Sequence, residues 1–216
     1  MDFKDAYKWV NVEFMLEGFL VTLEVAAAAI VLSFLIGCIA GTLRYMKIPV
    51  LSQLAAFLVE LVRNLPLLLI IFFTMFALPE VGIKFGIVQS AIVALTVFEA
   101  AMISEIVRSG LHSIPKGQVE ASRSSGLTPF QTLWHIVLPQ GLRRMVPPLV
   151  SQFISLLKDT SLAVIIALPE LMHNANIVIA HNFRTAIPVL ILAAFLYFVV
   201  NYALSLASRR LENRMA

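Results

Sequence analysis

Long apolar runs separated by short polar segments dominate the chain. A helix needs about 20 mostly apolar residues to cross the hydrocarbon core of a bilayer. Five segments reach that length: residues 20–43, 53–78, 87–106, 146–168 and 187–207. Inside hydrocarbon every backbone polar group must find a partner within the protein, which favours helices over isolated strands. The pattern therefore predicts an all-α polytopic membrane protein with five transmembrane helices, built as a single membrane domain over residues 1–216.

The composition agrees with a chain that is surrounded by membrane lipid. Its residues are 60% hydrophobic and 13% charged, whereas soluble domains are about 45–50% apolar and about 25% charged. The basic net charge is therefore not interpreted as nucleic-acid binding. Cys38 is the one cysteine of the sequence, so no intrachain disulfide is predicted. The four histidines show no zinc-type spacing, and no metal site is predicted.

Lysine and arginine in the loops predict the orientation, because cytoplasmic loops of membrane proteins carry an excess of these residues. Four of them lie on one side of the predicted spans: Lys4, Lys8, Lys84 and Arg184. Ten lie on the other side: Arg44, Lys47, Arg108, Lys116, Arg123, Arg143, Arg144, Arg209, Arg210 and Arg214. The richer side is expected to be cytoplasmic, which places the N-terminus outside and the C-terminus in the cytoplasm.

A polar stretch over residues 115–139, which we call the elbow, interrupts the apolar pattern on the predicted cytoplasmic side. Pro115 and Gly126 predict the limits of a short helix, with the proline in its first turn and the glycine as a left-handed C-terminal cap. Thr128 and Gln131 then predict a capping box that starts a second helix, with a proline between them at the first position. Pro139 is expected to end that second helix.

The two faces of the elbow differ in character. Small side chains on the first helix let another surface approach closely: Ala121, Ser122, Ser124 and Ser125. Apolar side chains on the second helix follow the i, i+3, i+4, i+7 spacing of one stripe: Phe130, Leu133, Trp134 and Val137. From these residues alone the elbow is either a docking surface for another protein or an ordinary interfacial loop whose stripe lies on the membrane.

The spacing of the elbow resembles the membrane subunits of ABC importers. Their pattern is EAA, three residues, glycine, nine residues and Ile-x-Leu-Pro. This chain has Glu120-Ala121-Ser122, then Gly126, then Ile136-Val137-Leu138-Pro139 at the same spacing, with Ser122 in place of alanine. In that family the first helix is the coupling helix, which sits in a groove of a cytoplasmic ATPase. The resemblance implies that role for Glu120, Ala121, Ser122, Arg123, Ser124, Ser125 and Gly126.

The resemblance extends over most of the chain. The segments RNLPLLLIIFF (63–73), SEIVRSGLHSIPKGQVEA (104–121), LPQGLRRMVPPL (138–149) and LLKDTSLAVI (156–165) are similar to the polar-amino-acid branch of the binding-protein-dependent transport family, of histidine, glutamine and glutamate type. Departures are Met102, where many relatives carry tyrosine, and Asn64-Leu65, where glycine and a hydroxyl residue are commoner. The resemblance implies a bacterial cytoplasmic membrane protein that works with an ATPase carrying ATP and Mg, a second permease and an extracytoplasmic amino-acid-binding protein.

Ionisable groups at membrane depth are costly, and they usually line a pathway or pair with one another. A site for a zwitterionic amino acid needs an anion, a cation or helix dipoles, and hydroxyl groups. The candidate substrate-binding residues are Glu99, Lys158, Asp159, Thr160 and Arg63. The alternative is that Lys158 pairs with a neighbouring acid, or that residues 158–162 form a packing or gate element.

Three further features of the predicted spans concern helix structure rather than substrate. Glu60 with Arg63, and Glu105 with Arg108, stand at i, i+3 and are expected to form surface ion pairs near the cytoplasmic ends. Pro66 removes a backbone hydrogen bond from the second span and predicts a kink there.

Motifs that the chain lacks narrow the function. It contains no GxxxxGK[ST] loop, so a partner must supply the ATPase. It contains neither GxSxG nor HExxH, so no catalytic residues are predicted. The leading hypothesis is the membrane-spanning permease subunit of an ATP-driven importer for polar amino acids, with the path formed by a dimer. The alternatives are a self-contained secondary transporter with Glu99 or Asp159 as its proton or ion site, and a membrane enzyme or assembly factor. The identity of the amino acid and of the second permease stays open.

Overall fold

Every secondary-structure element of the computed structural model, which describes residues 1–215 and the side chains of residues 1–210, is helical. The α-helices are α1 (Phe3–Ala6), α2 (Trp9–Met46), α3 (Leu51–Arg63), α4 (Leu67–Phe72), α5 (Ile87–His112), α6 (Lys116–Ser124), α7 (Pro129–Thr132), α8 (Leu138–Asp159), α9 (Leu171–His181) and α10 (Ala186–Met215). Turns of π-helix form η1 (Phe73–Ala77) and η3 (Leu133–Val137). Turns of 3₁₀-helix form η2 (Leu78–Val81), η4 (Thr160–Ile166) and η5 (Phe183–Thr185).

The chain divides into two compact units, and each is assembled from separated stretches of the sequence. Unit 1 comprises Met1–Ile30, Pro66–Thr96 and Ile154–Leu204, and unit 2 comprises Val31–Leu65, Val97–Phe153 and Ser205–Ala216. The core of unit 1 joins α1, α2, α9 and α10 through Ala6, Met15, Leu171, Ala175, Val178, Val189 and Ala193. The core of unit 2 joins α5, the segment after it, η3 and α8 through Ile103, Val107, Leu111, Ile114, Leu133, Val137, Met145 and Leu149.

Four helical segments of the described residues are long and apolar enough to cross a membrane. They are Trp9–Met46, Ile87–His112, Pro129–Ile166 and Phe183–Arg210. A fifth is added when the bent pair Leu51–Arg63 and Leu67–Val81 is counted as one span. The prediction of an all-α multi-pass protein is confirmed. Several helices extend well beyond their predicted limits, because hydropathy detects only the part of a helix that is apolar enough for hydrocarbon.

The second predicted span, residues 53–78, is not one continuous helix. It breaks between Arg63 and Leu67, so α3 and α4 are separate helices. Pro66 has no N–H to donate, and its ring disfavours helical backbone in the residue before it, so the α3 helix ends here. The predicted kink at Pro66 is therefore present as a full break. The segment still counts as one candidate span when the two helical parts are taken together, but the disturbance at Pro66 is larger than the predicted kink.

The fourth predicted span, residues 146–168, also changes its helical form. Helix α8 ends at Asp159, and the chain continues as the 3₁₀ turns of η4 up to Ile166. Ala167 then takes a left-handed conformation at φ +58°. A stretch of 3₁₀-helix inside a span often marks a hinge. This stretch begins directly after Lys158 and Asp159, the charged residues that the sequence singles out in this span.

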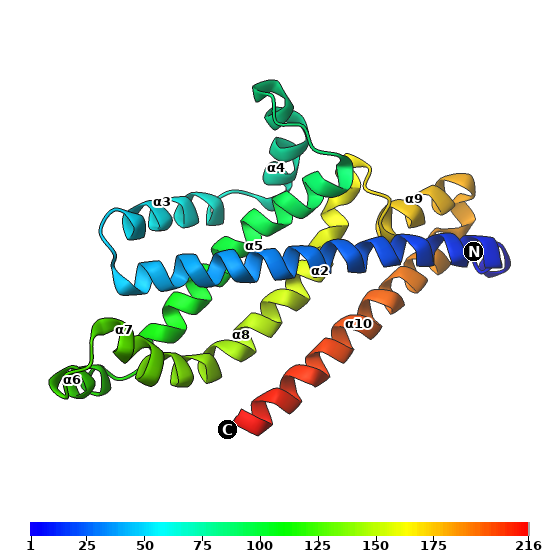
Figure 1. Cartoon of the computed structure of the whole chain (residues 1–216). Helices are drawn as coiled ribbons and strands as arrows, with labels where there is room; N and C mark the ends of the chain where they lie inside the picture. Colours follow the sequence, from blue (N-terminus) through cyan, green and yellow to red (C-terminus); the bar gives the residue numbers. More distant parts are fainter. Residues whose placement is uncertain (216) are drawn as a thin grey trace. The chain divides into compact units, whose positions relative to one another are not determined.

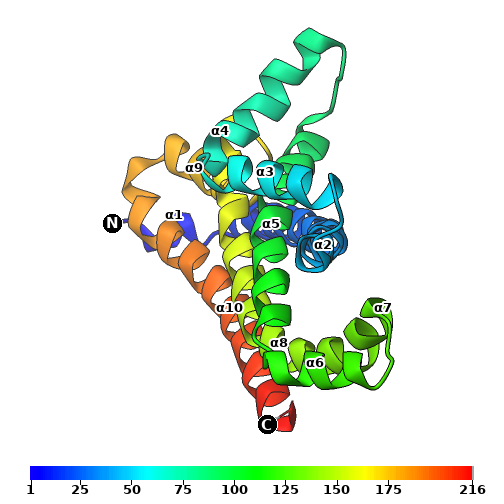
Figure 2. The ribbon, with the colours of Figure 1, turned by 90° about the vertical axis from the view of Figure 1, so that its left-hand side faces the viewer.

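Two glycines on α2 allow a close approach to α5 within unit 2 (Figures 1 and 2). Gly37 and Gly41 stand four residues apart, which is the small-xxx-small spacing of tightly packed membrane helices. A Cβ added at Gly41 would lie 2.6 Å from the carbonyl oxygen of Ser104, and one added at Gly37 would lie 2.6 Å from Cγ2 of Ile103. The contact depends on the absence of side chains on one face of α2.

We expect the substitution Gly41→Ala to destabilise the protein by about 1–3 kcal/mol, the usual cost of overpacking a close contact. The reason is that the new methyl group meets the backbone carbonyl of Ser104 and not the flexible end of a side chain. Gly117→Ala in α6 is the matched control, because no atom lies within 4 Å of an added Cβ there. Thermal unfolding of both variants in detergent measures the effect. Equal melting temperatures for Gly41→Ala and the parent chain would contradict this account of the α2–α5 contact.

Candidate functional site

The first helix of the elbow, α6, ends in the left-handed turn that the sequence predicts. Gly126 has φ +89°, and its N–H donates to the carbonyl of Arg123 at 3.0 Å. The next N–H, of Leu127, donates to the carbonyl of Ser122 at 3.2 Å. These two bonds are the pair of a Schellman cap. Pro115 stands one position before α6, as its N-cap, rather than inside the first turn.

The second helix of the elbow starts with the predicted capping box. The Thr128 hydroxyl accepts the N–H of Gln131 at 3.2 Å, and the Gln131 side-chain oxygen accepts the N–H of Thr128 at 2.8 Å. The prediction that Pro139 ends this helix was wrong. The π turn η3 leads directly into α8, where Pro139 is the second residue. A π turn shifts the hydrogen-bond register, and the first turn of a helix does not need the N–H that proline lacks.

The small-residue face of α6 is exposed at three of its four positions, Ala121, Ser124 and Ser125. Ser122 is buried, and its hydroxyl donates to the carbonyl of Val119 at 2.8 Å and lies 3.1 Å from the hydroxyl of Thr132. The prediction that Ser122 belongs to an exposed face was therefore wrong. It fastens α6 to α7, and Figure 2 shows these two short helices side by side.

The predicted apolar stripe of the elbow is divided between two environments. Leu133 and Val137 are buried in the core of unit 2. Phe130 and Trp134 are exposed at 62% and 58%, and their rings stack with centroids 6.4 Å apart. Only one side of η3 reaches the core, so half of the stripe remains outside it.

A single carboxylate in unit 2 is shared by three arginines. Glu105 pairs with Arg44 at 3.0 Å, with Arg63 at 3.7 Å, and with Arg108. The predicted pairs Glu60–Arg63 and Glu105–Arg108 are both present. Arg44, whose side chain is only 8% exposed, was not predicted as a member, because the contact joins helices that are distant in the sequence. The cluster links α2, α3 and α5 within unit 2.

The candidate substrate residues fall in both units. In unit 2, Glu99 is 1% exposed, and it accepts a hydrogen bond of 3.2 Å from the side-chain amide of Gln152, a residue that the sequence did not single out. Arg63 in the same unit takes part in the ion pairs with Glu60 and Glu105.

The other three candidates lie in unit 1, where α8 ends and η4 begins. Thr160 is fully buried, and its hydroxyl donates to the carbonyl of Leu157 at 2.7 Å. Asp159 is partly buried, and Lys158 is exposed. Within the described residues Lys158 has no acidic partner within 4 Å, so the structure does not contain the neighbouring ion pair considered for it. Asp159 and Thr160 thus occupy the change of helix type in this span.

A buried polar cluster in unit 1 was missed by sequence reasoning. The fully buried Glu170 caps α9, accepting the N–H groups of Met172 at 2.9 Å and His173 at 2.7 Å. The Tyr197 hydroxyl donates to the same carboxylate at 3.3 Å. Burial raises the pKa of Glu170, while the backbone N–H groups lower it. The sequence did contain a signal for this cap, an acidic residue directly before an apolar helix. The five-span interpretation treated that helix as part of a loop.

No group of three or more histidine, cysteine, aspartate or glutamate side chains that could hold a metal ion occurs among the described residues. The elbow brings its predicted residues together on α6 and the following turn, whereas the substrate candidates form two separate sets.

Comparison with known proteins gives concordant results. The family model described as binding-protein-dependent transport system inner membrane component matches residues 33–216. The chain is 66% identical, over 99% of both chains, to the probable glutamine ABC transporter permease protein GlnP of Bacillus subtilis (strain 168). It is 37% identical, over 95% of its own length and 94% of the relative, to the probable permease GlnM of the same organism. A solved structure of an amino acid ABC transporter with histidines matches with a TM-score of 0.87 and 25% identity over 94% of both chains.

Proposed function

The chain belongs to the family of binding-protein-dependent transport system inner membrane components, and from this premise we propose that it forms the membrane path of an ATP-driven importer for glutamine. Members of this family are multi-pass permease subunits of ABC importers in the cell membrane and not enzymes. The observation that carries glutamine as cargo is the 66% identity, over 99% of both chains, to a probable glutamine permease. Family membership does not favour the self-contained secondary transporter considered from the sequence.

The proposed assembly contains two permease subunits, cytoplasmic ATPase subunits that bind ATP and Mg, and an extracytoplasmic binding protein that delivers the amino acid. The second permease is either an identical copy or a paralogue. Similarity to both GlnP and GlnM, at 66% and 37% identity, supports a system in which related permeases occur together. Because this chain carries no nucleotide loop, all nucleotide chemistry belongs to the ATPase subunits.

Within this assembly the N-terminus is proposed to be outside and the elbow and the C-terminus in the cytoplasm. The ten-to-four distribution of basic residues supports that orientation. Reporter fusions after Lys84, in the segment before α5, and after Gln118, in α6, are expected to fall on opposite sides of the membrane. Finding both reporters on one side would refute the orientation.

Transport assays test the cargo and the substrate residues together. We expect proteoliposomes containing the full assembly to take up glutamine with ATP and binding protein present, in preference to histidine and glutamate. Asp159→Asn and Glu99→Gln are expected to impair uptake at low glutamine concentration, because each carboxylate is proposed to meet the ligand or the gate. Co-purification of the ATPase is the control and is expected to stay normal. Unchanged uptake by a variant removes that residue from the site, whereas uptake of another amino acid instead of glutamine refutes the cargo.

The elbow is proposed to be the contact through which the ATPase moves the membrane helices. Support comes from the exposed small side chains of α6 and from the tight turn that ends it. In the proposed contact Glu120 and Arg123 supply charge at the docking surface, and Ala121, Ser124 and Ser125 allow close approach. Ser122 contributes by holding α6 against α7.

Gly126→Val is expected to abolish coupling. The backbone at φ +89° is strained for a β-branched residue by about 1–3 kcal/mol, and the added Cβ itself meets no atom of the chain within 4 Å. Gly126→Asn is the matched control, because asparagine tolerates left-handed backbone, and it is expected to retain coupling. The measurements are ATPase co-purification and uptake per ATP hydrolysed. Normal coupling in the valine variant would show that this turn is not part of the coupling element.

A further inference from the structure

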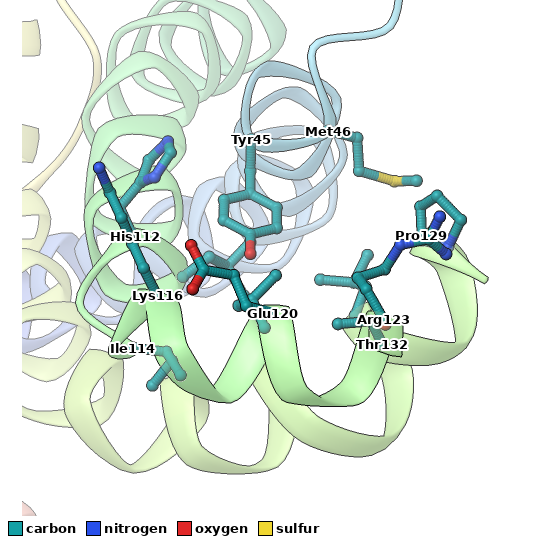
Figure 3. A pocket seen from close by; sticks show the side chains of 12 residues that line it. Tyr45, Met46, His112, Ile114, Lys116, Glu120, Arg123, Pro129 and Thr132 are labelled. Carbon is teal, nitrogen blue, oxygen red and sulfur yellow. The ribbon is translucent and has the colours of Figure 1, made fainter. Parts of the chain in front are cut away.

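A cavity of about 430 Å³ lies beside the elbow within unit 2 (Figure 3). Its walls come from the C-terminal ends of α2 and α5 and from α6, α7 and η3. Ligand sites have volumes of about 300–1,000 Å³, so the space is large enough for a small molecule or a headgroup. The elbow therefore has an inner surface as well as the outer surface proposed to meet the ATPase, and the exposed residues Glu120 and Arg123 stand at the rim that the two surfaces share.

The floor and the rim of this cavity differ chemically. Leu111, Ile114 and Leu133 are buried and make an apolar floor. The exposed rim carries a basic group at each of two ends, Lys116 beside His112 at one and Arg123 at the other (Figure 3).

One acidic side chain, Glu120, also lines the cavity, and it lies between the two basic ends in Figure 3. It makes no ion pair within 4 Å among the described residues. The basic groups outnumber this carboxylate, so the rim attracts an anion. The apolar floor favours an anion with an apolar part, and the Glu120 carboxylate favours one with a hydrogen-bond donor.

The position of the cavity along the helices points to the membrane surface. The candidate spans Trp9–Met46 and Ile87–His112 both end at residues that line it, Met46 and His112. Leu133 on the cavity wall is followed in the chain by Trp134, whose exposed ring stacks on the exposed ring of Phe130. Such aromatic rings are enriched where the hydrocarbon core meets the lipid headgroups. The level suits a lipid headgroup, whichever side of the membrane the elbow occupies.

We propose that this cavity binds the headgroup of an acidic phospholipid of the phosphatidylglycerol class. The phosphate lies between the basic ends formed by Lys116 and Arg123, and the carboxylate of Glu120 accepts a hydrogen bond from a glycerol hydroxyl. Basic pockets between membrane helices are suited to such headgroups. The apolar floor favours a lipid over a free phosphate ion, which has the same charge but no apolar part to bury.

Fluorescence quenching of Trp134 tests this assignment in the full-length chain. Trp9→Phe provides a background in which Trp134 is the one tryptophan of the sequence. The chain in mixed detergent micelles is titrated with phosphatidylglycerol that carries brominated acyl chains, and separately with brominated phosphatidylcholine. We expect saturable quenching by phosphatidylglycerol at mole fractions where phosphatidylcholine quenches only in proportion to its amount.

The variant Lys116→Gln is expected to raise the mole fraction of phosphatidylglycerol needed for half-maximal quenching roughly fivefold, the usual effect of one basic residue at an anionic surface. Arg143→Gln, an equal charge change at an exposed position outside the cavity, is the control and is expected to cause no shift. Equal quenching by the two lipids overturns the proposal, as does an unshifted Lys116→Gln curve. Displacement by inorganic phosphate, beyond that caused by chloride at the same ionic strength, assigns the site to a free anion and also overturns it. Displacement by the purified ATPase assigns the cavity to that partner and likewise overturns the proposal.

Discussion

The backbone of a chain in hydrocarbon must satisfy its own hydrogen bonds, and this constraint shapes the rest of the structure. Long stretches such as α2 satisfy it as uninterrupted helix. Where a helix breaks or changes form, side chains take over the unpaired groups. The Thr74 hydroxyl lies 2.9 Å from the carbonyl of Ile71 in the π turn after Pro66, and Glu170 caps the first N–H groups of α9. Irregular backbone is thus placed where polar side chains are within reach.

One further irregular place, where α8 gives way to η4, coincides with two residues proposed to act in transport. Asp159 ends α8, and Thr160 begins the 3₁₀ turns of η4. Discontinuous helices in transporters bring helix ends, with their partial charges, to the middle of the membrane. A change of helix type also bends more easily than a regular helix. In the proposed transport cycle, the same local structure would provide polar groups for a ligand and a hinge for the motion that moves it.

The elbow shows how local chemistry can serve two surfaces at once. The Schellman cap at Gly126 and the capping box at Thr128 form a tight turn, and the Ser122–Thr132 contact holds its two arms together. In the proposed coupling, this turn would transmit a displacement from the exposed face of α6 to α8, because η3 continues into α8 without a loop. The cavity behind α6 means that whatever fills it can change how stiffly the elbow is held.

The sequence by itself determined the helical class, the multi-pass character, the disturbance at Pro66 and both caps of the elbow, because each depends on residues that are neighbours along the chain. It also identified the family through the EAA-type spacing. Only the tertiary structure decided that Ser122 is buried, that Arg44 joins Glu105, that Glu170 lies in a core, and that η3 continues into α8. The continuation of η3 into α8 could not be predicted, because a proline in the first turn of a helix and a proline that ends a helix look alike in sequence. The others are contacts between segments distant along the chain, and such contacts depend on packing that no local pattern records.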